Sequence, residues 1–156
     1  MPNSPTGLYL EDLQEGQSFT SDSLEVDAQQ IVEFASSFDP QPFHTDAVAA
    51  EGTFFGGLAA SGWHTAALTM RLLVGHGAPF AVGLIGAGAQ IEWPRPTRPG
   101  DVLHARTEVL KITPSRSRPD RGMVLLRTDT LNQRGEIVQV LTSTAVVTRR
   151  PQASAG

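Results

Sequence analysis

The sequence predicts a single α+β domain in which an antiparallel sheet wraps around a long, buried central helix. Residues 62–74 are apolar on nearly every side, which is typical of a helix that is buried over most of its surface. Four later segments are rich in Val, Leu, Ile and Thr, as strands are: 87–93, 102–113, 123–131 and 137–149. Since the last three are consecutive and joined by hairpin turns, they imply antiparallel strands that wrap around the preceding helix.

The elements before the central helix are predicted from shorter patterns. Residues 13–26 indicate a loop and a first strand. Asp27 is a suitable N-cap for a helix over 28–38, where apolar residues recur at helical spacing until Asp39-Pro40 ends the pattern. A short Ala-rich helix follows near 45–52, and we expect Asp46 to cap it.

The composition fits one compact domain. The chain has 156 residues, 40% of them hydrophobic and 18% charged, which is enough for one core. We expect this domain to span 1–156, with disordered polar tails at 1–6 and 151–156. Zero Cys excludes a disulfide framework and thiolate zinc sites.

Charge and hydropathy argue against two classes of partner. The net charge of −4 is unlike that of nucleic-acid-binding proteins, which normally carry a basic stripe. The sequence shows no apolar run long enough to span a membrane and no export signal, so the cytoplasm is the expected location.

Residues 37–44, Ser-Phe-Asp-Pro-Gln-Pro-Phe-His, contain a carboxylate and an imidazole five positions apart across two prolines. Each proline fixes its own φ and pushes the preceding residue toward extended geometry, so we expect a stiff, irregular loop from Phe38 to Phe43. Asp39 and His44 can polarise one water together without a metal. The spacing alone is also common in loops whose polar residues are simply solvated.

The downstream sequence favours the first interpretation because it resembles a known family. In the MaoC-like dehydratases, which include the (R)-specific enoyl-CoA hydratases, a Ser-Gly-Asp-x-Asn-Pro-x-His-x-Asp segment precedes an Ala-His-Gly-Met segment that opens a long buried helix. The matching positions here are Ser37, Asp39, Pro42, His44, Asp46, Ala60 and Gly62. Residues 91–101 are similar to the family's strand, Pro-rich turn and Gly-Asp. The resemblance covers residues 10 to 148 and implies a hot-dog fold and a homodimer.

Three positions depart from the family pattern. Phe38 stands where the family has Gly, Gln41 where it has Asn, and Ser61 where it has His. Gln41 keeps the amide on a longer arm, and Ser61 is suited to cap the central helix. These departures leave the acid and base in place and the substrate range open.

The resemblance implies a hydro-lyase that hydrates enoyl thioesters and, in reverse, dehydrates (R)-3-hydroxyacyl thioesters. Asp39 and His44 would activate the water, and the Gly62 N–H at the helix start would bind the thioester carbonyl as an oxyanion hole does. Close packing at a helix start is the other explanation for Gly62. We expect substrate contacts from four further residues: Gln41, Ser61, Arg95 and Arg98. The arginines would meet the phosphates of coenzyme A, which enters as part of the substrate, and no cofactor or metal is expected.

Two other functions remain open on the same fold. One is a hot-dog acyl-CoA thioesterase, and the other is a non-catalytic protein that binds acyl thioesters. The sequence does not distinguish coenzyme A from an acyl carrier protein. The glycines at 83, 86 and 88 lack dinucleotide-binding spacing and are interpreted as room for the helix or for an acyl chain. His64 is expected to be a packed or interface residue.

Overall fold

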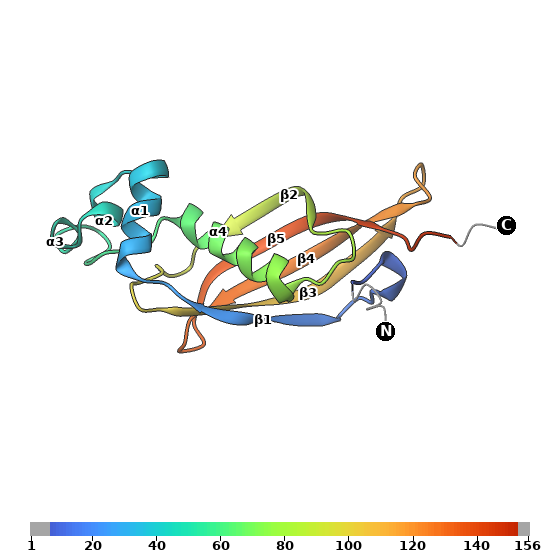
Figure 1. Cartoon of the computed structure of the whole chain (residues 1–156), viewed down its shortest axis with the longest axis horizontal. Coiled ribbons are helices and arrows are strands. Elements are labelled where there is room, and N and C mark those ends of the chain that lie inside the picture. The colour runs from blue at the N-terminus through green and yellow to red at the C-terminus, as the bar shows by residue number, and fades with distance from the viewer. Residues whose placement is uncertain (1–6, 153–156) are drawn as a thin grey trace, which may run out of the picture.

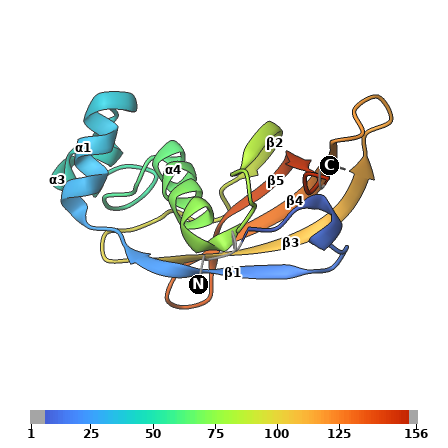
Figure 2. The ribbon, with the colours of Figure 1, turned by 45° about the vertical axis from the view of Figure 1, so that its right-hand side comes forward.

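A five-stranded antiparallel sheet curves around one helix in the computed structural model, which describes residues 7–152 (Figures 1 and 2). The strands lie in the order β1-β3-β4-β5-β2, so β1 and β2 form the two edges. Figure 2 shows α4 on the concave face of the sheet, which confirms the predicted hot-dog architecture. The elements are β1 (Ser18–Glu25), α1 (Ala28–Phe38), α2 (Pro42–Thr45), α3 (Ala47–Ala50), α4 (Gly62–Leu72), β2 (Ile85–Glu92), β3 (Val102–Pro114), β4 (Arg121–Leu131) and β5 (Ile137–Thr148).

The three long strands lie where the sequence predicts them. Along β3, Leu103, Ala105 and Val109 are fully buried, whereas Arg106 and Glu108 are exposed. This alternation gives the sheet one face against the core and one face in water. The sequence missed a short 3-10 turn at Leu10–Asp12 before β1.

Strand β2 begins at Ile85, two residues earlier than predicted, so Gly86 and Gly88 lie inside the strand. The cause is pairing with β5, in which Gly86 lies opposite Ala145 and Gly88 opposite Thr144, with a shift in register between the two pairs. Glycine is a poor strand former, so the extension of the strand back to Ile85 is explained by this tertiary pairing.

The helix caps predicted before the central helix, Asp27 and Asp46, are both confirmed. The side chain of Asp27 accepts a hydrogen bond from Gln30 N at 2.7 Å and begins α1. The side chain of Asp46 accepts from Val48 N and Ala49 N at 3.0 and 3.1 Å and begins α3.

Figure 1 shows α1, α2 and α3 grouped beyond one end of α4 and the sheet.

The stiff loop predicted from Phe38 to Phe43 is shorter than expected. Phe38 ends α1, and a one-turn helix, α2, starts at Pro42 and contains Phe43 and His44. Proline suits the first helical position because its missing N–H would have no partner there. Only the segment 39–41 is an irregular connection, and it is braced between two helix ends.

The central helix is less buried than its sequence predicts. Helix α4 continues through a π-helical turn (η2, Leu73–Gly77), and it buries Thr65, Thr69 and Leu72 against the core. Trp63 and Val74, however, are each 60% exposed. The reason is that the sheet of one chain covers only one side of the helix.

Two expectations concern the chain ends and membranes. Of the tails predicted at 1–6 and 151–156, residues 1–6 and 153–156 lie outside the described residues, and Pro151 and Gln152 are exposed without regular structure. Within residues 7–152, no helix has the length and apolar character needed to cross a bilayer.

Candidate active site

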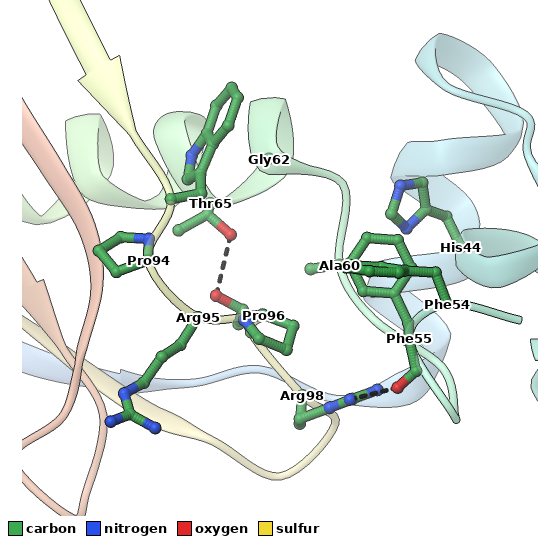
Figure 3. A pocket seen from close by; sticks show the side chains of 12 residues that line it. His44, Phe54, Phe55, Ala60, Gly62, Thr65, Pro94, Arg95, Pro96 and Arg98 are labelled. Atoms are coloured by element: carbon green, nitrogen blue, oxygen red, sulfur yellow. Dashed lines mark hydrogen bonds between the residues drawn. The ribbon is translucent and has the colours of Figure 1, made fainter. Parts of the chain in front are cut away.

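A cavity of about 580 Å³ opens beside the N-terminal end of α4 (Figure 3). Three segments that are distant in sequence line it. His44 of α2, with Phe54 and Phe55 from the loop after α3, forms one side. Ala60, Gly62 and Thr65 approach from the start of α4, and residues 93–98 after β2 form the opposite side. The cavity therefore joins the three segments that carry the family resemblance.

His44 is almost fully buried, at 5% exposure, and its ring orientation is fixed. Its Nδ1 lies 2.6 Å from the carbonyl oxygen of Ala59. Since a carbonyl only accepts, Nδ1 carries the hydrogen, and Nε2 is left as the atom that can exchange a proton. Nε2 lies 3.4 Å from Oδ2 of Asp39.

Asp39 caps the C-terminal end of α1, and its side chain is 18% exposed. It accepts hydrogen bonds from the Gln41 side-chain amide and from the Ser61 hydroxyl. The largest single influence on the pKa of Asp39 is partial burial, which raises it. The two hydrogen bonds and the neighbouring His44 together outweigh burial, so the pKa of Asp39 lies below its ordinary value. The group is therefore a carboxylate at neutral pH.

Ser61 is fully buried and is the N-cap of α4. Its oxygen accepts from Trp63 N at 3.3 Å while its hydroxyl donates to Asp39. The expected contact of Ser61 with a substrate is therefore not what the structure shows, because this side chain is turned to Asp39 and has no exposed surface. Gln41, also expected to bind substrate, is exposed and likewise contacts Asp39.

Gly62 lines the cavity as the first residue of α4. Within the described residues its N–H has no hydrogen-bond acceptor, as is usual in a first helical turn. A Cβ at this position would lie 2.7 Å from the indole of Trp93, closer than packed atoms allow. The close packing considered for Gly62 is thus observed, and the N–H is free, while its role toward a thioester carbonyl stays a prediction.

The two arginines expected at the site differ in what they contact. The Arg98 guanidinium donates to the carbonyl oxygen of Phe55 (Figure 3) and to those of Gly57 and Leu58, the last two at 3.0 and 3.3 Å. It therefore ties the loop 55–58 to the loop 94–98. Arg95 is 59% exposed and pairs with Glu136 at 3.1 Å, so only Arg95 keeps much of its surface open to solvent.

Some residues of the cavity carried no signal in the sequence. Phe54 is 96% exposed although it lines the cavity. Thr65 and Thr97 are buried, and their hydroxyls are 3.0 Å apart, joining α4 to the opposite wall. Trp93 was visible only as the end of a strand before a Pro-rich turn. No local pattern identifies such residues, because their roles depend on contacts across the fold.

His64 lies outside the cavity and is packed, as expected. Its ring stacks on Phe34 with centroids 4.6 Å apart and planes 7° apart, and the residue is 6% exposed. Among the described residues, its Nδ1 has no hydrogen-bond partner. Burial lowers the pKa of His64 below its ordinary value.

Comparisons with known proteins agree with this geometry. A family model described as the MaoC like domain matches residues 12–128. A crystal structure of the MaoC-like dehydratase from Rhodospirillum rubrum is 62% identical, covering 94% of this chain and all of that chain with a TM-score of 0.93. The uncharacterized protein YdeM of Bacillus subtilis is 34% identical over 130 residues, 81% of this chain and 89% of its own. The (R)-hydratase from A. caviae involved in PHA biosynthesis is 28% identical, covering 90% and 99% of the two chains with a TM-score of 0.68.

Proposed function

The chain belongs to the MaoC-like dehydratase family, and we propose that it hydrates enoyl thioesters and, in reverse, dehydrates (R)-3-hydroxyacyl thioesters. One observation carries this proposal. An imidazole with a defined open nitrogen and a helix-start N–H line one cavity, and an ionised carboxylate lies 3.4 Å from that nitrogen. The similarity to hydratase and dehydratase structures supports a hydro-lyase.

The first step is activation of water. Oδ2 of Asp39 and Nε2 of His44 are both acceptors when His44 is neutral, so one water can donate a hydrogen to each. The oxygen of this water then adds to the β-carbon of the enoyl thioester. The pair takes one proton from the water and returns a proton to the α-carbon, which leaves both side chains unchanged.

The second requirement is stabilisation of the charge that develops on the thioester oxygen. Addition at the β-carbon moves electrons onto the carbonyl, giving it enolate character. The N–H of Gly62 faces this charge from the positive end of the α4 dipole. Ser61 supports both the water-activating pair and the Gly62 N–H, because its hydroxyl donates to Asp39 and its oxygen caps α4.

We place the carrier of the thioester at the Arg95 side of the cavity. Arg95 lines the cavity, and its side chain extends away from His44 in Figure 3. A phosphate of coenzyme A can replace Glu136 as its partner. Arg98 is a weaker candidate because three carbonyl oxygens already accept its hydrogen bonds.

The functional form is proposed to be a homodimer. Trp63 of α4 and Val74 of the following turn η2 expose apolar surface on the open side of the central helix, and strand β2 is an unpaired sheet edge. A symmetric copy would cover both.

A panel of enoyl-CoA esters tests the function directly. Hydration removes the absorbance of the conjugated enoyl thioester and yields a 3-hydroxyacyl product without free thiol. Release of thiol without that product would identify a thioesterase. Binding without either change would identify a non-catalytic acyl-thioester protein.

A further inference from the structure

A second cavity, of about 440 Å³, lies between α4 and the strands β2 and β5. Its lining is largely apolar and includes Ala66 and Met70 of α4, Ile91 of β2, and Leu141 and Ala145 of β5. Gly86 and Gly88 also line it, and the absence of side chains there leaves its space open. The reaction proposed above uses no residue of this cavity.

The two cavities follow one another along the same two elements. On α4, Gly62 and Thr65 line the first cavity, and Ala66 and Met70 line the second. Ile91 in β2 lines the second cavity, and Trp93, which follows the end of β2, lines the first cavity. Residues 91 and 93 share one face of an extended chain, so the cavities are neighbours.

One hydrogen bond marks the boundary between them. Nε1 of Trp93, which lines the first cavity, donates to Oε1 of Gln139, which lines the second, at 2.9 Å. This contact links the end of β2 to β5. The indole and the amide therefore form a partition between the cavities.

The partition is held in place from several sides. Gln139 is fully buried, and its Nε2 donates to the Thr69 hydroxyl at 3.1 Å. The same hydroxyl donates to the Thr65 carbonyl at 2.9 Å and pairs with the Thr130 hydroxyl at 2.6 Å, so the amide orientation is fixed. The indole packs closely over Gly62, and Trp63 lies edge-on to it at 5.4 Å between centroids.

We propose that Trp93, held by Gln139, limits the length of the acyl chain by closing the catalytic cavity from the apolar cavity behind it. This inference rests on the proposed function, since it assumes that the substrate is an acyl thioester. The thioester and the reacting carbons occupy the first cavity, whereas a longer hydrocarbon tail meets the indole. The preferred substrates are accordingly short-chain enoyl thioesters.

The test compares Trp93→Ala with the unaltered protein across chain lengths. We expect the unaltered protein to hydrate crotonyl-CoA with a higher kcat/KM than octenoyl- or decenoyl-CoA. In Trp93→Ala the ratio of decenoyl-CoA to crotonyl-CoA should rise at least ~10-fold, because each methylene moved into apolar surroundings is worth about fourfold. Tyr9→Ala removes an aromatic side chain outside both cavities and should leave the ratio unchanged.

A binding measurement separates this inference from the reaction itself. Calorimetric titration with the saturated esters butyryl-CoA and decanoyl-CoA needs no turnover. If the unaltered protein hydrates no enoyl-CoA, the proposed function fails, yet a gain in decanoyl-CoA affinity confined to Trp93→Ala still supports the partition. Trp93→Phe, which keeps a ring but loses the bond to Gln139, serves if Trp93→Ala does not fold, and a smaller shift in the same direction is expected.

Two results would overturn the inference. One is a folded Trp93 variant whose chain-length ratio equals that of the unaltered protein in both turnover and binding. The other is an unaltered protein that already prefers decenoyl-CoA to crotonyl-CoA.

Discussion

Nε2 of His44 faces Oδ2 of Asp39 across 3.4 Å, and the proton on Nδ1 of the same ring is held by the Ala59 carbonyl. Two acceptors at this separation suit a shared water. We therefore expect Asp39→Asn and His44→Ala each to lower kcat by ~100-fold or more, the order for a lost general acid or base. Because both act on one water, the double variant should be little slower than the poorer single variant.

Melting curves on the same samples distinguish a catalytic role of Asp39 and His44 from a structural one. If the two residues only brace the 39–41 connection, stability should fall with the rate. Fully multiplicative losses in the double variant would contradict a shared step.

Ser61→Ala tests how the carboxylate is held ionised. The Ser61 hydroxyl is one of the bonds that keep the pKa of Asp39 low, so its removal should raise that pKa. The acidic limb of the pH profile of kcat/KM should then move to higher pH, because the carboxylate form is lost earlier as pH falls. The lost helix cap should also cost about 1 kcal/mol of stability. Ser36→Ala, on the exposed side of α1, should leave the profile in place, and an unmoved limb in Ser61→Ala would exclude the positioning role.

Gly62 can be tested once its contact with Trp93 is relieved. In the unaltered background, Gly62→Ala should disturb the site merely by displacing the indole. In a Trp93→Ala background, Gly62→Ala should keep the turnover of that background, since the N–H remains. Gly62→Pro in the same background removes the N–H at a position that tolerates proline, and kcat should fall ~100- to 1000-fold. Equal turnover of the two double variants would show that this N–H does not bind the oxyanion.

His64 should make the fold sensitive to mild acid. Its pKa in the folded protein lies below the ordinary value of 6.5, so the unfolded chain binds the proton more readily. Stability conferred by the neutral ring is present above pH 6.5 and decreases as pH falls below it. His64→Leu should flatten the dependence of Tm on pH in this range. Parallel curves for His64→Leu and the unaltered protein would refute the assignment.

The homodimer has a direct test in solution. Light scattering at micromolar concentration should give twice the mass of one chain. Val74→Glu puts a charge on the exposed surface of η2, the turn that continues α4, and should shift the protein toward monomer. Leu110→Glu makes the same kind of change at another exposed apolar residue, on β3, and should leave the mass unchanged. A strictly monomeric, folded unaltered protein would rule out the dimer.

The sequence predicted those features that are encoded in local patterns. The three long strands and the caps Asp27 and Asp46 follow from periodicity and capping chemistry, and the family resemblance implied that Asp39, His44 and Gly62 belong to one site. Contacts between distant residues were not predictable in this way. Arg98 reaches carbonyl groups about forty positions earlier, and Trp93 lies over Gly62 only after β2 has paired with β5. The partial exposure of α4 could not be predicted from the local sequence either, because an apolar pattern does not show which other elements cover the helix.

The guanidinium of Arg98 has a consequence for engineering by loop exchange. The segment that contains Phe54 and Phe55 forms one wall of the cavity, and it is an obvious region to transplant between relatives. Three carbonyl oxygens of that segment depend on a single planar donor group in the opposite wall, which a lysine cannot reproduce. A graft of residues 53–60 should therefore be made together with residues 94–98, as one cassette whose two pieces match each other.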